Sequence, residues 1–143
     1  MAGDGGDSGL MTKVALLGAG LLGSAIGHRL LTVGCSLRVW NRDPARCEPL
    51  MSAGAQVVAD PAEAAQGCAT VISVFRDGPV TAEVVARIGS LSGACVMPMG
   101  TMGISESVAL AAQVQGQGGC YLEAPVLGSR PEALQGRLLV MAG

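Results

Sequence analysis

The stretch Val14-Ala15-Leu16-Leu17-Gly18-Ala19-Gly20-Leu21-Leu22-Gly23-Ser24-Ala25 decides the fold of this chain. The apolar run over 14–17 predicts a buried parallel strand, and a helical pattern begins directly after the last glycine. Gly18 permits the tight turn off the strand, Gly20 lets a pyrophosphate approach the backbone because it has no Cβ, and Gly23 lets the helix pack close to the strand. The segment therefore predicts a strand, a phosphate-binding turn and a helix, in that order.

The start of this expected helix predicts a binding site for an anion. Its first N–H groups have no partner inside the helix, and the positive end of the helix dipole points at the turn. A strand before the turn and a helix after it form the context that a dinucleotide-binding motif requires. The alternative is a glycine-rich turn in an unrelated α/β protein, because the chain has 22 glycines.

Length and composition fit one folded domain and argue against several classes of partner. The chain has 143 residues, of which 50% are hydrophobic and 14% are charged, and this is enough for one domain with its own core. Nucleic-acid sites use basic patches and stacking rings, whereas this chain has a net charge of −2 and 2% aromatic residues. No apolar run is long enough to span a membrane. We therefore expect neither a nucleic acid nor a membrane as partner.

The N-terminal segment and the cysteines indicate where the protein resides. We expect residues 1–11 to be disordered, since they are small and acidic and lack the basic and apolar regions of a signal peptide. The 5 cysteines are widely spaced and never form a CxxC pair, so they are expected to be reduced thiols of a cytoplasmic protein. No metal site is expected because His28 is the only histidine. We expect His28 to lie on a solvated helix face.

The rest of the chain alternates between expected strands and helices. Further strands are expected at 37–40, 56–58, 70–74, 94–97, 121–124 and 138–141, and further helices after Asp43, Asp60 and Asp77 and over 105–115. Each of these aspartates stands one or two residues before a proline, which is typical of a helix N-terminus. This order predicts an α/β fold with a doubly wound, mainly parallel sheet and right-handed crossovers.

The end of the expected strand 37–40 distinguishes NAD from NADP. In this type of fold an acidic residue there binds the ribose 2′-OH of NAD, whereas an arginine accommodates the 2′-phosphate of NADP. Asn41 and Arg42 occupy the place, and Asp43 follows as the expected helix cap. The planar fork of Arg42 suits a phosphate, and Arg46 lies one helical turn further on. The sequence therefore favours NADPH over NAD; the alternative for Arg42 is an ordinary surface charge.

Four stretches resemble the β-hydroxyacid dehydrogenase family, which includes 3-hydroxyisobutyrate dehydrogenase, and in particular its glyoxylate and succinic semialdehyde reductase branch. They are 18–23, 39–42, 99–102 and 121–129, and the last is similar to the family's substrate signature Asp-Ala-Pro-Val-Ser-Gly-Gly. The resemblance covers residues 12–143. It implies a Rossmann-type NAD(P)-binding domain that is incomplete at its C-terminal end.

The resemblance implies roles for the residues around the cofactor. Backbone N–H groups of Leu21 and Leu22 would contact the diphosphate, and Thr101 matches a threonine near the nicotinamide ribose. The family covers the adenosine and ribose side with residues that match Phe75, Arg76 and Val80. The full predicted cofactor-binding set is Gly18, Gly20, Leu21, Leu22, Gly23, Asn41, Arg42, Arg46, Phe75, Arg76, Val80 and Thr101.

The resemblance also implies a substrate site. Gly128 and Ser129 match the two positions whose N–H groups hold the substrate carboxylate, and small residues let two such groups converge on one anion. Leu127 stands where the signature has a serine, which removes one hydroxyl donor, and Glu123 replaces the usual aspartate. The implied substrate is a short aldehyde or keto acid that bears a carboxylate.

The family's catalytic group is a lysine on an all-helical second domain. That domain would follow residue 143, and we expect it to be absent from this chain. The only lysine, Lys13, starts the first expected strand, whereas ligands bind outside the carboxyl ends of the strands. No catalytic residue is therefore predicted, and whether the chain alone turns over a substrate stays open. A homo-oligomer is compatible with the family, in which the helical domain builds much of the dimer.

The expected function is the NADPH-binding domain of an oxidoreductase that reduces glyoxylate, succinic semialdehyde or a similar short acid. Two alternatives remain open. The cofactor domain of an imine reductase shares the Trp40-Asn41-Arg42 signal. A non-catalytic dinucleotide-binding or scaffolding module would explain the missing lysine. The 128–129 pair favours the acid-metabolising branch.

Overall fold

The computed structural model describes residues 11–142. Its strands are β1 (Lys13–Leu17), β2 (Ser36–Trp40), β3 (Gln56–Val57), β4 (Thr70–Ser73), β5 (Cys95–Pro98), β6 (Cys120–Tyr121), β7 (Val126–Leu127) and β8 (Leu139–Val140). Its helices are α2 (Leu21–Thr32), the 3-10 helix η1 (Pro44–Cys47), α3 (Glu48–Ser52), α4 (Pro61–Ala65), α5 (Gly78–Ala86), α6 (Ile104–Gly116) and α7 (Arg130–Leu134). Apart from Met11, the segment predicted to be disordered, 1–11, lies outside the described residues.

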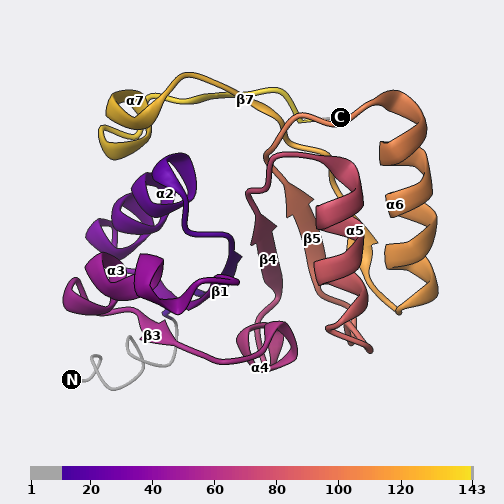
Figure 1. Ribbon diagram of the computed structural model, residues 1–143, viewed down its shortest axis with the longest axis horizontal. Coiled ribbons are helices and arrows are strands. Elements are labelled where there is room, and N and C mark those ends of the chain that lie inside the picture. The colour runs from indigo at the N-terminus through magenta and orange to yellow at the C-terminus, as the bar shows by residue number, and fades with distance from the viewer. Residues whose placement is uncertain (1–10, 143) are drawn as a thin grey trace.

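Six strands form one parallel sheet in the order β3-β2-β1-β4-β5-β6 (Figure 1). The chain winds outward from β1 in one direction and then returns to β4 to wind in the other. The place where the order reverses, between β1 and β4, is the switch point at which such sheets bind ligands. The predicted α/β, doubly wound, mainly parallel fold is confirmed.

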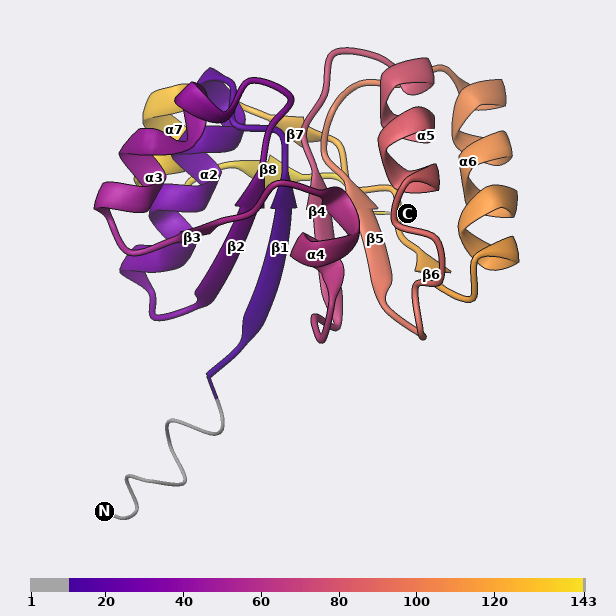
Figure 2. The ribbon, with the colours of Figure 1, turned by 60° about the horizontal axis from the view of Figure 1, so that its bottom comes forward.

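The central strand β1 is buried on both faces. Ala15 and Leu17 face a core built with α4, α5 and α6, whereas Val14 and Leu16 face a core built with α2 and α3. Figure 2 shows α2 and α3 to one side of β1 and α5 and α6 to the other. Burial on both faces explains why the strand reads as a continuous apolar run rather than an alternating one. Among the described residues, no helix is long and apolar enough to cross a membrane.

Aspartate side chains begin three of the helices, as predicted. Asp43, Asp60 and Asp77 each accept a hydrogen bond from a backbone N–H two or three residues later. The helix after Asp43 begins as the 3-10 turn η1 before it continues as α3. Pro49 has no N–H to donate to the carbonyl of Ala45, so an α-helical bond cannot form there.

The C-terminal segment differs from the prediction. The expected strand 138–141 is not a seventh strand of the large sheet: β8 pairs antiparallel with β7, which the sequence did not predict, and α7 lies between them. The expected strand 121–124 is shorter, since β6 ends at Tyr121, although the N–H of Ala124 still donates to the carbonyl of Pro98 at 3.0 Å. Short runs of Leu and Val have the same pattern in either sheet, so their partner depends on tertiary packing.

Candidate functional site

The predicted cofactor residues gather at one edge of the large sheet. The register places Leu17 beside Trp40 and Ser73, and Ser73 beside Pro98. The loops that follow β1, β2, β4 and β5 therefore emerge next to one another at the carboxyl ends of these strands. Every residue of the predicted cofactor set lies in one of these loops or in the helix that follows it. This is the edge at which doubly wound sheets bind ligands.

The three glycines of the segment 18–23, called the glycine turn below, have different surroundings. Gly18 has a φ of +104°, and a Cβ there would collide with the carbonyl oxygen of Val74. A Cβ at Gly23 would collide with the carbonyl oxygen of Gly18. Gly20 has an ordinary φ of −72°, and no atom lies within 4 Å of the place its Cβ would take. The fold thus requires Gly18 and Gly23, whereas the space beside Gly20 is free for a ligand.

Helix α2 begins at this free space without a side-chain cap. Its N-cap is Gly20, and its first turn contains no acidic residue. The N–H groups of Leu21 and Leu22 and the positive end of the helix dipole therefore face the space beside Gly20. No acidic side chain of the first turn neutralises this positive potential. The diphosphate of a dinucleotide fits this arrangement, because it supplies the missing negative charge and acceptors.

Asn41 holds the glycine turn in place. Its Oδ1 accepts a hydrogen bond from the N–H of Ala19 at 2.8 Å, and its Nδ2 donates to the carbonyl oxygen of Asp43 at 2.9 Å. The carboxamide thus links the loop after β1 to the loop after β2. Asn41 acts on the turn through Ala19, and its predicted direct contact with the cofactor stays a prediction.

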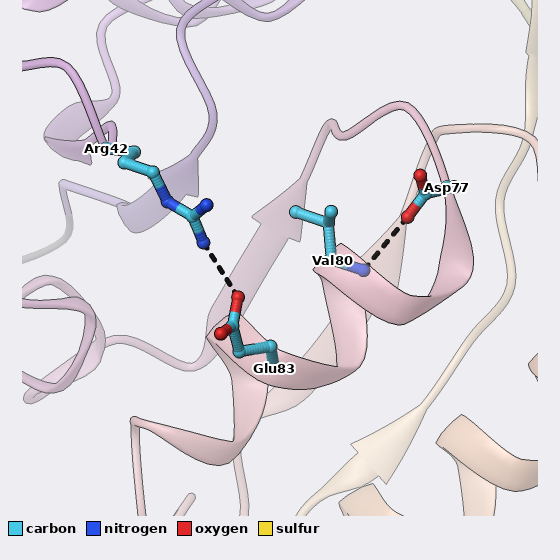
Figure 3. A network of polar contacts seen from close by, with 4 residues as sticks. All are labelled: Arg42, Asp77, Val80 and Glu83. Carbon is cyan, nitrogen blue, oxygen red and sulfur yellow. Dashed lines mark hydrogen bonds and ion pairs between the residues drawn. The ribbon is translucent and has the colours of Figure 1, made fainter.

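Arg42 reaches from the end of β2 to helix α5 and forms an ion pair there. Its Nη2 lies 2.7 Å from Oε1 of Glu83, as Figure 3 shows. Both side chains are largely exposed, at 66% and 63%. An exposed pair of this kind contributes only about 0.2–1 kcal/mol. A stronger anion can therefore replace Glu83 on the guanidinium.

The side of the site formed by β4 and β5 is partly apolar. Phe75 is half-buried, and its ring lies 3.2 Å from the position of a Cβ on Gly18. Val80, at the start of α5, is also half-buried, whereas Arg76 and Thr101 are exposed. The structure thus places apolar and polar groups of the predicted set on the same side of the switch point.

A cavity of about 300 Å³ lies next to the glycine turn, between α2 and η1. Gly20 and Leu21 line it together with Arg46, and so do His28 and Arg130. Arg46 was predicted as a cofactor residue, while Arg130 was not, because only the packing of α7 against α2 brings it here. His28 was predicted to be solvated, but it is half-buried at this cavity. The two arginines, Arg46 and Arg130, place positive charge next to the turn, which favours an anion there.

A larger cavity lies elsewhere. Its volume is about 820 Å³, and it is lined by α4 and by the residues that precede β4 and β5, including Cys68 and Ala94. These residues stand at the amino ends of the strands, opposite the switch point. The position argues against a dinucleotide there, because such ligands bind at the carboxyl ends.

The predicted substrate pair lies at the start of α7. Gly128 has a φ of +130°. Ser129 donates two hydrogen bonds to Oε1 of Glu132, one from Oγ at 2.6 Å and one from its N–H at 2.7 Å. These hydrogen bonds lower the pKa of the Glu132 carboxyl. The N–H that was predicted to hold a substrate carboxylate therefore already holds a carboxylate of the chain itself.

The described part of the chain offers no metal centre. Within residues 11–142 no three His, Cys, Asp or Glu side chains lie together as ligands. All 5 cysteines are free thiols. Burial raises the pKa of the Cys47 and Cys68 thiols, which makes them weaker nucleophiles.

The sheet order and the open glycine turn define a dinucleotide-binding domain of the Rossmann type. A family model described as the NAD binding domain of 6-phosphogluconate dehydrogenase matches residues 13–143. The chain therefore belongs to this family of NAD(P)-binding domains. The predicted relation to the hydroxyacid dehydrogenases is confirmed by the relatives that follow.

Glyoxylate/succinic semialdehyde reductase 1 of Arabidopsis thaliana is 32% identical over 135 residues, which cover 91% of this chain and 47% of the reductase. Human cytokine-like nuclear factor N-PAC is 31% identical over 135 residues, or 91% of this chain and 24% of that protein. Mycobacterium tuberculosis 3-hydroxyisobutyrate dehydrogenase superposes with a TM-score of 0.84 at 24% identity, covering 93% of this chain and 46% of the enzyme. An imine reductase from Pseudomonas sp. superposes with a TM-score of 0.81 at 26% identity, covering 85% of this chain and 43% of the reductase. The chain spans less than half of each of these proteins.

Proposed function

We propose that the chain is the NADPH-binding domain of an oxidoreductase that reduces a short aldehyde or keto acid. The observation that carries the proposal is the free space beside Gly20, which faces the uncapped start of α2. Arg42 supports NADPH over NADH, because it stands at the end of β2 and no acidic side chain precedes it there.

The residues of this chain bind and orient the cofactor, which when bound supplies the hydride. The N–H groups of Leu21 and Leu22 hold the diphosphate, and Asn41 keeps the glycine turn in shape through Ala19. Arg42 takes the 2′-phosphate by charge-assisted hydrogen bonds. Phe75, Arg76 and Val80 would cover the adenosine and ribose side, and Thr101 would lie near the nicotinamide ribose.

The substrate class is supported by the segment 123–129 and by the similarity to the Arabidopsis reductase. A substrate carboxylate would bind the N–H groups of Gly128 and Ser129 in place of Glu132. Lys13, the only lysine, lies at the amino end of β1, opposite the switch point. The proton donor is therefore proposed to come from a helical domain that the relatives' greater length accommodates. The free thiols support a reducing compartment such as the cytoplasm.

A second candidate is a dinucleotide-binding module without turnover. Two observations favour it: the position of Lys13 at the wrong edge, and the similarity to N-PAC, whose name describes a nuclear factor rather than a reductase. An assay of NADPH consumption with glyoxylate by the 143-residue chain and by a full-length protein separates the two. Activity of the longer protein alone supports the reductase, since loss of a general acid lowers rates by about 10²- to 10⁴-fold.

Titration calorimetry of the chain with NADPH and NADH tests the cofactor. NADPH should bind more tightly, and Arg42→Ala should weaken NADPH by about 1.5–3 kcal/mol, the contribution of hydrogen bonds to a charged group, while NADH is unchanged. Arg137→Ala, at an exposed position after α7, controls for the lost charge. Equal losses for both cofactors would contradict the assignment of the 2′-phosphate to Arg42.

A further inference from the structure

We propose that Glu83 is a specificity-determining residue that competes with the 2′-phosphate of NADPH for Arg42. The inference rests on the proposed function, since it concerns the same cofactor site. It assigns a role to Glu83, which lies on α5, outside the glycine turn and outside the end of β2.

The ion pair joins the two halves of the sheet. Arg42 follows β2, in the half wound outward from β1, whereas Glu83 lies on α5, the helix that follows β4 in the other half. The two residues are 41 positions apart, and their contact of 2.7 Å bridges the switch point. Figure 3 shows the guanidinium extended toward α5, with the side chain of Val80 beside it. A cofactor that places its adenosine between the end of β2 and the start of α5 must meet this pair.

A carboxylate and a phosphate use the same face of a guanidinium. Both accept paired N–H groups from its planar fork. A phosphate monoester carries a charge of about −1.5 to −2 at pH 7 and has three acceptor oxygens, so it replaces the singly charged carboxylate of Glu83. NADH has a hydroxyl at this position and needs no such exchange. Glu83 therefore weakens NADPH binding alone and reduces the discrimination that Arg42 provides.

The released carboxylate has a second cation within one helical turn. Arg87 stands four residues after Glu83, the spacing at which side chains on a helix are neighbours. Its guanidinium lies 5.2 Å from the centroid of the Trp40 ring, and Trp40 ends β2. Arg87 thus lies beside the last residue of β2, and its spacing from Glu83 lets it receive that carboxylate when Arg42 binds the phosphate. A new ion pair with Arg87 would offset part of the free energy lost when Glu83 leaves Arg42.

Substitution of Glu83 tests the competition. Glu83→Gln should raise the affinity for NADPH by about 1.4- to fivefold, the range that an exposed ion pair spans, and leave the affinity for NADH unchanged. Glu63→Gln makes the same change of charge on α4, where Glu63 is exposed and lines the cavity at the opposite edge. This control should leave both affinities as they are. The measurement is titration calorimetry of the 143-residue chain at fixed salt, because salt screens exposed pairs.

The variants Arg42→Ala and Arg42→Ala/Glu83→Gln show whether Glu83 acts through Arg42. Competition predicts that Glu83→Gln has no effect on NADPH once Arg42 is gone, since the two residues share one interaction. If Glu83→Gln still raises the NADPH affinity in the Arg42→Ala background, Glu83 repels the phosphate directly, and the proposal is overturned. An unchanged or lower NADPH affinity of Glu83→Gln would also overturn it. Failure of the parent chain to bind either dinucleotide overturns the proposed function as well, whereas NADPH binding that is insensitive to Glu83 overturns this inference alone.

Discussion

The glycine-containing turns that lead into α2 and into α7 leave their N–H groups in opposite states. The glycine turn leads into α2, whose third helical residue is Gly23, while the turn at 128–129 leads into α7, whose third helical residue is Glu132. The carboxylate of Glu132 accepts a hydrogen bond from the N–H of Ser129, as in a capping box. Gly23 offers no acceptor, so the start of α2 stays open. In these two turns, the third helical residue determines whether the chain itself supplies an acceptor for the N–H groups of the turn.

The two turns also differ in what holds them. The glycine turn is held by the hydrogen bond from Ala19 to Asn41, and its Gly18 packs on Val74. The second turn depends on α7, which packs on α2 through Ala133 and Ile26. The strands that flank α7 leave Leu127 and Leu139 exposed at 54% and 59%. Contacts from the loops after β2 and β4 thus hold the glycine turn, whereas the second turn is held through the packing of α7 on α2.

Gly20→Val should have the largest effect on the open turn. Its branched side chain fills the free space, so binding of both NADPH and NADH should fall below detection in calorimetry. The free energy of unfolding in urea should stay within about 0.5 kcal/mol of the parent chain, because the φ of −72° suits any residue. Gly116→Val is the matched control, since a Cβ there also meets no atom. Near-parental binding by Gly20→Val would show that the turn is not the phosphate site.

Gly23→Ala should damage the fold rather than the binding surface alone. The added Cβ collides with the carbonyl oxygen of Gly18, and overpacking of this kind costs about 1–3 kcal/mol. Urea unfolding measures the loss, and Gly20→Ala is the control that should be near neutral. If both alanine variants unfold at the same urea concentration, the packing of α2 on the glycine turn is less important than the structure indicates.

Asn41→Ala should weaken NADPH and NADH equally. It removes the acceptor of the Ala19 N–H, and a lost hydrogen bond costs about 0.5–1.5 kcal/mol. Asn41→Asp keeps the acceptor, so NADH binding should recover, while the added charge should weaken NADPH. A loss confined to NADPH in Asn41→Ala would mean that Asn41 contacts the 2′-phosphate itself, rather than the turn.

Glu132→Gln should have the smallest effect, and it should depend on pH. Because the hydrogen bonds from Ser129 lower the pKa of Glu132 in the folded state, their contribution to stability is fully present above the unfolded pKa. It is lost as the pH falls through the lower folded pKa. The difference in Tm between the parent chain and Glu132→Gln should therefore shrink as the pH is lowered from neutral into the acidic range. A constant difference would show that the carboxylate form does not cap α7.

Most of the parallel sheet was predictable because its signals are local. Apolar runs mark β1 and β4, and the three aspartate caps mark η1, α4 and α5. The C-terminal segment was not predictable in this way. Its short strands carry no feature that selects the large sheet over a separate antiparallel pair, and Val126 pairs with Val140 in a structure in which α7, between the two strands, packs on α2.

In the candidate site too, features set by neighbouring residues were predictable, and contacts between distant residues were not. By itself the sequence determined the glycine turn, the start of α2 and the arginine after β2, because each depends on residues within a few positions of one another and on the conformations that glycine and capping side chains allow. Only the tertiary structure decided that Asn41 binds Ala19, that Arg42 meets Glu83, and that Arg130 joins the cavity beside Gly20. These contacts join residues that are 22 or 41 positions apart or lie on different helices. No local pattern records such separations, since packing of the strands and helices brings the partners together.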